Sequence, residues 1–179
     1  MKVVLLFLLS TLSVVAQAQT PTSEYLASTG GIGPIKIGMS KAAVEKLIGT
    51  KLTLPKYSKA YDSYDWDTVK CTYKELEYEL VFSKTFYGND TASRLGVYQI
   101  VCRSPLVKTK SGIAIGDNKL KIFQTYEQYR LEYAPDWDKE HFPKRATVSL
   151  YDNESSNVLI FYIEEGVVTG FGATIFEGC

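Results

Sequence analysis

The sequence predicts an α+β fold of two tandem units, each a helix followed by an antiparallel meander, with the helices packed on one face of the sheet or sheets. Two observations lead to this prediction. A short motif occurs twice, 78 positions apart, as Gly33–Lys41 and Ser111–Lys119. Strand-like alternation of apolar and polar residues follows each copy. We therefore expect a first unit over residues 31–108 and a second over residues 109–179.

The N-terminal residues have the pattern of a cleavable secretory signal peptide. Lys2 is followed by an apolar run, and Ala16 and Ala18 place small side chains at the positions that signal peptidase reads. The apolar stretch of about 13 residues is shorter than the roughly 20 that cross a bilayer. We expect residues 1–18 to be removed and residues 19–30 to form a flexible mature N-terminus. The mature protein is expected to be soluble, in the periplasm or outside the cell.

Each copy of the motif combines two alternate isoleucines, a glycine turn and a helix cap. In the first copy Ile35 and Ile37 precede Gly38, and Ser40 is placed to cap a helix that stops at Gly49. The same positions in the second copy are filled by Ile113, Ile115, Gly116 and Asn118. The second helix is expected to be longer and to reach Arg130.

The segments that follow the helices predict antiparallel strands. Residues 75–82 alternate between apolar side chains on one face and glutamates on the other, and a partner strand is expected over residues 95–103. In the second unit we expect strands over residues 146–151, 158–164 and 167–176. Each unit is therefore predicted to end in a small antiparallel meander.

Composition and charge argue against several classes of partner. The chain has 20 basic and 20 acidic residues, a formal net charge of zero and no basic stripe. Nucleic acid and stable membrane insertion are therefore not expected. A hydrophobic content of 45% and 13 tyrosines predict a folded, sheet-rich body.

The three cysteines favour one disulfide. Cys71 and Cys102 lie on either side of a predicted hairpin, and an exported protein meets an oxidising compartment. We predict a bridge between these two residues, which leaves Cys179 free or joined to another molecule. The alternative is that all three thiols stay reduced and partly buried.

Standard catalytic and metal-binding motifs are absent from the sequence. His141 is the only histidine, and an envelope hydrolase that uses it with nearby carboxylates such as Asp138 is the alternative function. Three aspartates, Asp62, Asp65 and Asp67, have a spacing like that of a calcium loop, but the loop glycine and the distal glutamate are missing. We therefore predict no metal, no cofactor and no enzymatic activity.

Aromatic residues recur at matching places in the two units. An Asp-Trp-Asp triplet contains Trp66 in the first unit and Trp137 in the second, with Tyr64 and Tyr133 close by. Aromatic side chains on loops are common anchors for protein or sugar ligands, because they bury a large area at small entropic cost. The alternative is that they close over the core of each unit. We take these four residues as the candidate binding residues.

The repeated motif resembles a known structural unit. Residues 35–49 read Ile-Lys-Ile-Gly-Met-Ser-Lys-Ala-Ala-Val-Glu-Lys-Leu-Ile-Gly and resemble the repeat of β-lactamase-inhibitory protein and of the outer-membrane-assembly lipoproteins (SmpA/OmlA, BamE-like); residues 112–118 look like a variant of it. The resemblance implies a tandem-repeat binding or inhibitory module without a cofactor or catalytic residues. The lipid-bearing cysteine of the lipoproteins is missing.

Taken together, these features predict an exported, non-enzymatic module that binds an envelope or extracellular protein, as an inhibitor or an envelope accessory. The alternatives are the hydrolase that uses His141 and a carbohydrate-binding protein that uses the aromatic residues.

Overall fold

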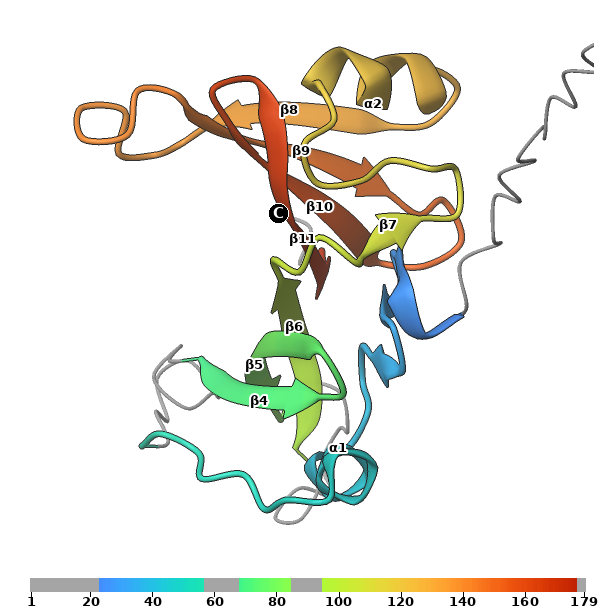
Figure 1. The fold of residues 1–179 in the computed structure, drawn as a ribbon, viewed down its shortest axis with the longest axis vertical. Helices are drawn as coiled ribbons and strands as arrows, with labels where there is room; N and C mark the ends of the chain where they lie inside the picture. Colours follow the sequence, from blue (N-terminus) through green and yellow to red (C-terminus); the bar gives the residue numbers. More distant parts are fainter. Residues whose placement is uncertain (1–22, 57–67, 85–94, 177–179) are drawn as a thin grey trace, which may run out of the picture.

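The computed structural model describes residues 23–56, 68–84 and 95–176 (Figure 1). Strands make up 46% of these residues and helices only 14%. The predicted α+β fold of two tandem helix-plus-meander units is therefore wrong, and the protein is mainly β. The described strands form two sheets, of seven and four strands. The helices are short, and strands that the sequence pattern did not predict enlarge both sheets.

Several predicted features lie outside the described residues. These are the signal peptide, Tyr64, Trp66, Cys179 and the three aspartates with calcium-like spacing. Within the described ranges, no helix is long and apolar enough to cross a membrane.

The larger sheet is antiparallel throughout and has the strand order β4-β5-β6-β11-β10-β9-β8. Its strands are β4 (Val69–Tyr73), β5 (Leu76–Ser83), β6 (Gly96–Cys102), β8 (Leu131–Pro135), β9 (Arg145–Tyr151), β10 (Asn157–Glu164) and β11 (Val167–Ile175). The five predicted strands are confirmed as β5, β6, β9, β10 and β11. The two edge strands, β4 and β8, were not predicted.

The smaller sheet is formed mainly by the N-terminal part of the described chain. After a 3-10 helix at Ser23–Tyr25, its strands are β1 (Leu26–Ser28), β2 (Gly31–Ile32), β3 (Ile35–Lys36) and β7 (Lys108–Thr109), in the order β3-β2-β1-β7. The prediction of a flexible N-terminus is therefore wrong for residues 23–30. Ala27 and Ile32 are buried in the core, and β1 pairs in parallel with β7, so this segment is held by packing and by hydrogen bonds.

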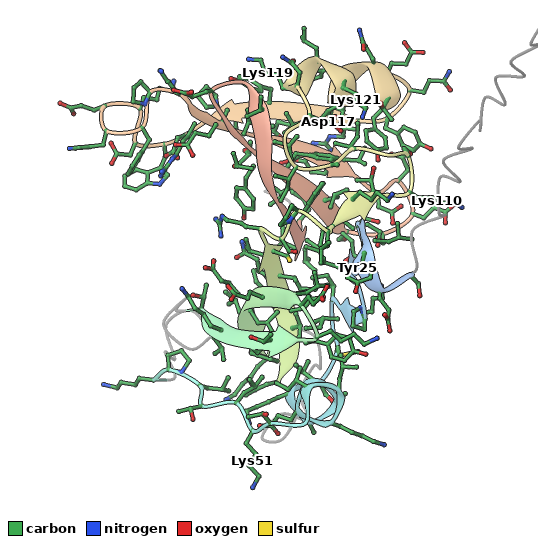
Figure 2. All side chains as sticks on the ribbon, viewed as in Figure 1. Tyr25, Lys51, Lys110, Asp117, Lys119 and Lys121 are labelled. Atoms are coloured by element: carbon green, nitrogen blue, oxygen red, sulfur yellow. The ribbon has the colours of Figure 1, made fainter. Side chains whose placement is uncertain are left out.

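The two helices start as predicted and differ in where they end. Helix α1 (Lys41–Ile48) is capped by Ser40, and Gly49 ends it with a φ of 72°. Helix α2 (Lys119–Thr125) is capped by Asn118 and ends five residues before Arg130. Tyr126 ends the helix with φ −117° and ψ 29°, and its ring packs against Phe161 in the core. Lys119 and Lys121 of α2 lie at one end of the molecule and Lys51, just after α1, at the other (Figure 2).

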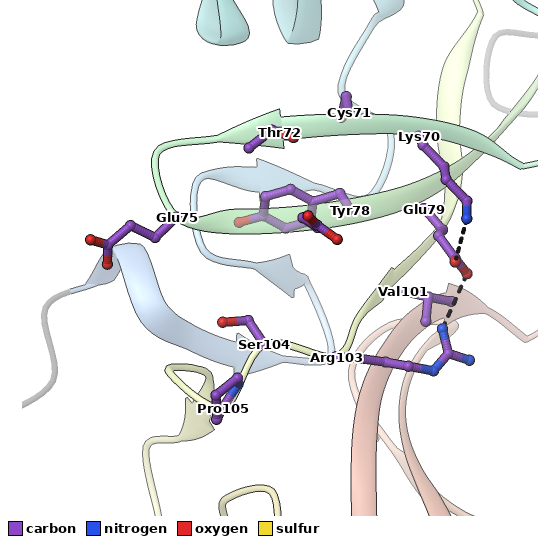
Figure 3. A pocket seen from close by; sticks show the side chains of 11 residues that line it. Lys70, Cys71, Thr72, Glu75, Tyr78, Glu79, Val101, Arg103, Ser104 and Pro105 are labelled. Atoms are coloured by element: carbon purple, nitrogen blue, oxygen red, sulfur yellow. Dashed lines mark hydrogen bonds and ion pairs between the residues drawn. The ribbon is translucent and has the colours of Figure 1, made fainter.

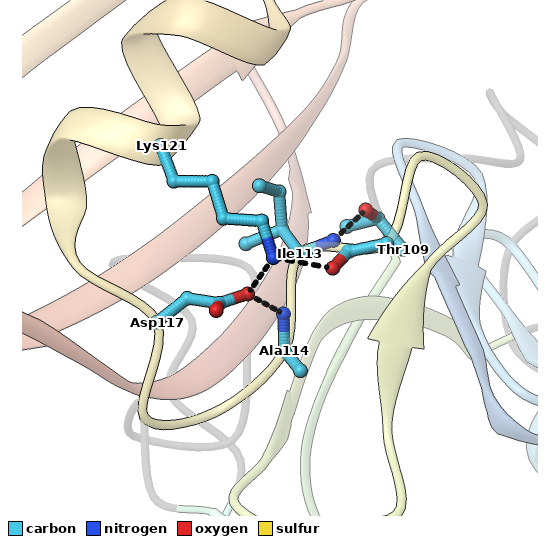
Figure 4. Close-up of polar contacts among 6 residues, drawn as sticks. Thr109, Ile113, Ala114, Asp117 and Lys121 are labelled. Carbon is cyan, nitrogen blue, oxygen red and sulfur yellow. Dashed lines mark hydrogen bonds and ion pairs between the residues drawn. The ribbon is translucent and has the colours of Figure 1, made fainter.

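Polar contacts fix the turn that leads into α2 (Figure 4). The carboxylate of Asp117 accepts hydrogen bonds from the backbone N–H of Ala114 and from Nζ of Lys121, both at 2.8 Å. The hydroxyl of Thr109 accepts a bond of 3.0 Å from the N–H of Ile113. These bonds connect β7, the turn and the first turn of α2.

The two copies of the sequence motif make the same backbone hydrogen bonds. The N–H of Gly38 donates to the carbonyl of Val97 on β6, and the N–H of Gly116 donates to that of Val168 on β11. The carbonyl of the next residue, Met39 in the first copy and Asp117 in the second, accepts a hydrogen bond from the N–H of the same valine. Each motif is thereby bound to the last strand of its own half.

The centre of the large sheet has a local twofold symmetry. Val97 and Val168 make the same hydrogen bonds to the two motifs and are 71 positions apart. The same separation relates Val101 to Gly172. Val101 lies directly opposite Gly172 where β6 pairs with β11. Matching register shifts occur in the neighbouring strand pairs, after Val81 in β5 and after Tyr162 in β10. The halves therefore meet strand to strand around an approximate twofold axis.

Candidate functional site

One face of the seven-stranded sheet packs against the core and the other carries two hollows. Leu80, Ile100 and Phe161 belong to the core, to which the helices and the small sheet also contribute. Side chains alternate along a strand, so the residues between them point to the opposite face. We call that side the open face; the residues discussed below are Lys70, Glu79, Val101, Arg103, Thr147, Tyr162 and Glu164.

The first hollow, of about 610 Å³, lies over β4, β5 and the end of β6 (Figure 3). Glu79 lies in it between two cations. Its Oε1 is 3.7 Å from Nζ of Lys70, and its Oε2 is 3.2 Å from Nη1 of Arg103. Exposed ion pairs contribute about 0–1 kcal/mol to stability. Glu79 therefore contacts Arg103 directly but adds little to the stability of the fold.

The second hollow, of about 560 Å³, lies over β9, β10 and the loop that follows β8. Its lining includes Arg103 again, together with Trp137, Arg145 and Tyr162. Arg103 is thus the residue common to both hollows. Because it follows β6 at the junction of the two halves, a ligand that filled both hollows would lie across this junction.

Gly170 and Gly172 leave space for the side chains of Arg103 and Tyr162. The guanidinium carbon of Arg103 lies 5.3 Å from the centroid of the Tyr162 ring. A Cβ at Gly170 would lie 2.9 Å from Cγ of Arg103, and one at Gly172 would lie 3.2 Å from the Tyr162 hydroxyl. Glycine at alternate positions of a strand is the signal that predicts such a close approach. The sequence prediction did not use it and therefore missed Arg103 and Tyr162.

The hydroxyl of Tyr162 stays protonated at neutral pH. Burial raises its pKa, and the hydrogen bond with Gln99 and the charge of Arg103 only partly offset this effect. Tyr162 can therefore donate or accept a hydrogen bond but does not exchange protons near pH 7. The protonated hydroxyl of Tyr162 is thus available for hydrogen bonding at the centre of the open face.

Trp137 stands at the rim of the second hollow and is 94% exposed. It follows Asp136, whose N–H donates to the carbonyl of Arg145 at 2.9 Å. The guanidinium of Arg145 lies 4.0 Å from the centroid of Phe142, and its Nε donates to Glu164 at 3.1 Å. The loop is thus held at its base, while the indole ring projects into solvent.

The structure does not bring Tyr133 and Trp137 together. Tyr133 lies opposite Val148, a core residue, and Nζ of Lys119 on α2 is 5.1 Å from its ring centroid. Tyr133 is therefore on the helix-bearing face of the sheet and Trp137 is on the open face. Two of the four candidate binding residues thus lie on opposite faces of the sheet.

The predicted disulfide between Cys71 and Cys102 is also wrong, and both thiols are free. Cys71 lies opposite Tyr78, and Tyr78 lies opposite Cys102 on the next strand. With strands about 4.8 Å apart, the two Cα atoms are separated by about 10 Å, beyond the roughly 7 Å that a disulfide can bridge. Burial raises the pKa of Cys71 to about 11, so its thiol is not a nucleophile at neutral pH.

Tyr78 is buried, and its hydroxyl has no hydrogen-bond partner among the described residues. Leaving a buried polar group unpaired is unfavourable, whereas removing it is not. We therefore expect Tyr78→Phe to leave the free energy of unfolding unchanged or to raise it by up to about 1 kcal/mol. Urea denaturation measures this change. A loss of 1 kcal/mol or more would show that the hydroxyl is hydrogen-bonded in solution.

His141 lines neither of the two hollows. Its Nδ1 is 2.9 Å from Oδ1 of Asp138, and its side chain is 73% exposed on the loop between β8 and β9. The hydrolase alternative needs this histidine and a carboxylate in a pocket that holds a substrate. Among the described residues, the structure places His141 beside Asp138 on an exposed loop and in neither hollow.

The described residues contain no group of three or more histidine, cysteine, aspartate or glutamate side chains placed to hold a metal ion. No protein-family model, curated protein or solved structure matches the chain. The function is therefore inferred from the geometry of the open face.

Proposed function

We propose that the protein is an exported, non-enzymatic module that binds another protein through the open face, with Arg103 at the centre of the contact. One observation carries this proposal: Arg103 lines two hollows on one face of the sheet, Tyr162 and Trp137 line the second of them, and the other face carries the core. Arginine, tyrosine and tryptophan are the residues that most often dominate the energy of protein interfaces.

The contacts of Arg103 and Tyr162 with their neighbours favour a surface that is ordered before binding. Arg103 is held by Glu79 and by the ring of Tyr162, and Tyr162 lies over glycines in the middle of a seven-stranded sheet. Side chains that are already ordered lose less entropy on binding. The resemblance of the repeated motif to inhibitory and assembly proteins agrees with a binding role.

A photo-crosslinking experiment tests the position of the interface. Benzoylphenylalanine replaces Thr147 on the open face, or Leu120 on α2 as the control, where the side chain is 60% exposed. We expect exposure of the protein to cell-envelope and culture fractions to give a crosslinked protein with the Thr147 probe only. Crosslinking from Leu120 alone would place the interface elsewhere.

With the crosslinked partner purified, Arg103→Ala and Trp137→Ala are each expected to weaken binding about 30-fold, which corresponds to about 2 kcal/mol. Calorimetry measures the affinities, with Leu120→Ala as the control that keeps the wild-type value. Unchanged affinity in both open-face variants would contradict the proposal. Glycan-array binding that depends on Trp137, without a crosslinked protein, would support the carbohydrate-binding alternative instead.

A further inference from the structure

Within residues 23–56, 68–84 and 95–176, no backbone group pairs with the outer edge of β4. Tyr73 and Leu76 face each other across a two-residue turn and therefore share hydrogen bonds. Because alternate residues of an antiparallel strand point their N–H and C=O groups to opposite sides, those of Lys70 and Thr72 point away from β5. β4 has no second neighbour among the described strands. Four backbone groups are thus presented outward.

A groove of about 530 Å³ runs along this edge. One wall is β4, and the other is formed by the end of α1 and by residues 50–53 that follow it. Lys51 and Lys70 are the two charged residues in its lining, and four threonines supply hydroxyl groups. The groove therefore combines a strand edge with two lysines, of which Lys70 also forms an ion pair with Glu79.

In the other half of the protein, the equivalent edge is covered by a strand. The equivalent residues are Cys71, Tyr78 and Cys102 in the first half and Leu150, Leu159 and Ala173 in the second. β9 therefore corresponds to β4, and β9 is paired on its outer side with β8. Lys70 corresponds to Ser149, which lies opposite Glu132. The strand equivalent to β4 thus pairs with one more strand on its outer side.

We infer that the outer edge of β4 binds an extended, acidic segment of a partner polypeptide by strand addition. The segment pairs antiparallel, as β8 does with β9, and its central acidic residue exchanges hydrogen bonds with Lys70. The residues before and after this acidic residue lie opposite Cys71 and Val69. At the equivalent positions of the other half, β8 has Leu131 and Tyr133. The expected sequence is therefore apolar–acidic–apolar. This inference does not rest on the open-face function, although Lys70 lines both the groove and the first hollow.

The test uses the mature full-length protein and one synthetic peptide, acetyl-Thr-Glu-Leu-Glu-Tyr-Glu-Thr-amide. Amide hydrogen exchange is followed by NMR. We expect the N–H groups of Lys70 and Thr72 to exchange fast in the free protein and at least about tenfold more slowly with saturating peptide. The N–H groups of Leu131 and Tyr133, on the outer edge of β8, are the internal control and keep their rates.

Two changed peptides separate backbone pairing from charge. N-methylation of the central glutamate removes the donor that would pair with Lys70, and replacing the three glutamates by lysine reverses the charge. Each change is expected to weaken binding about tenfold or more. A methylated peptide that binds as well as the parent would overturn the inference.

Variants of the protein give the complementary result. Thr72→Pro removes one outward N–H and leaves the β4–β5 hydrogen bonds in place, because proline is tolerated on edge strands. It is expected to weaken peptide binding about tenfold. If this variant does not fold, the double variant Lys51→Glu/Lys70→Glu carries the test with a similar expected loss. Lys110→Glu, on an exposed lysine in the other half (Figure 2), is the control with unchanged affinity.

Two other outcomes would overturn the inference. One is slow exchange of the Lys70 and Thr72 amides in the free protein, which would mean that the edge is already paired. The other is the absence of peptide binding. Neither result affects the open-face proposal, since Arg103 and Trp137 lie outside this groove.

Discussion

Replacing Phe161 by alanine is expected to lower the free energy of unfolding by about 4 kcal/mol. Phe161 is fully buried in the middle of β10. Its ring centroid is 5.7 Å from that of Phe171 on β11 and 6.0 Å from that of Tyr126 at the end of α2. The truncation removes contacts in both directions and leaves a cavity that a sheet of seven strands cannot collapse to fill.

Urea denaturation measures this loss, and two further variants locate its cause. Phe161→Leu keeps most of the volume and is expected to lose about 1–1.5 kcal/mol. Leu120→Ala removes an exposed side chain and should change stability by less than about 0.5 kcal/mol. A loss below 1 kcal/mol for Phe161→Ala would mean that the core is not packed around this ring.

Much of the large sheet could be predicted from the sequence, because alternation over seven or more residues is a strong local signal. β5 alternates between core residues such as Leu80 and outward glutamates such as Glu79, and its bounds were predicted within one residue. β8 has five residues and alternates only over Leu131–Tyr133, which is too short to predict a strand; it lies at an edge, and only Leu131 packs against the core. The fold class was wrong because edge strands and N-terminal strands of two or three residues carry too little pattern.

The candidate site was predicted less well, because it depends on contacts between distant segments. Trp137 could be selected as an exposed aromatic on a loop. Arg103 and Tyr162 meet only because β6 pairs with β11 and β11 with β10, a register that no local pattern in the sequence specifies. The disulfide prediction failed for the same reason: β5 lies between Cys71 and Cys102, so a pair that looks close in a hairpin is two strands apart.

Gly33→Ala is expected to destabilise the protein by about 3 kcal/mol through two separate effects. Gly33 has a φ of 58°, a conformation that disfavours alanine by about 1 kcal/mol. A Cβ there would also lie 2.4 Å from the carbonyl oxygen of Glu24 and 2.8 Å from the hydroxyl of Tyr78. Relief of such contacts in a packed region typically requires shifts that cost about 1–3 kcal/mol.

A second glycine separates the two effects. Gly49 has a φ of 72° but nothing within 4 Å of the position where its Cβ would lie, so Gly49→Ala should lose only about 1 kcal/mol. The double variant Gly33→Ala/Tyr78→Phe removes the hydroxyl contact and leaves the carbonyl of Glu24. It should therefore recover only part of the loss. Equal destabilisation at Gly33 and Gly49 would mean that the turn moves freely away from Tyr78. A larger loss at Gly33 that Tyr78→Phe partly recovers would mean that the turn after β2 is packed tightly against β5 of the large sheet.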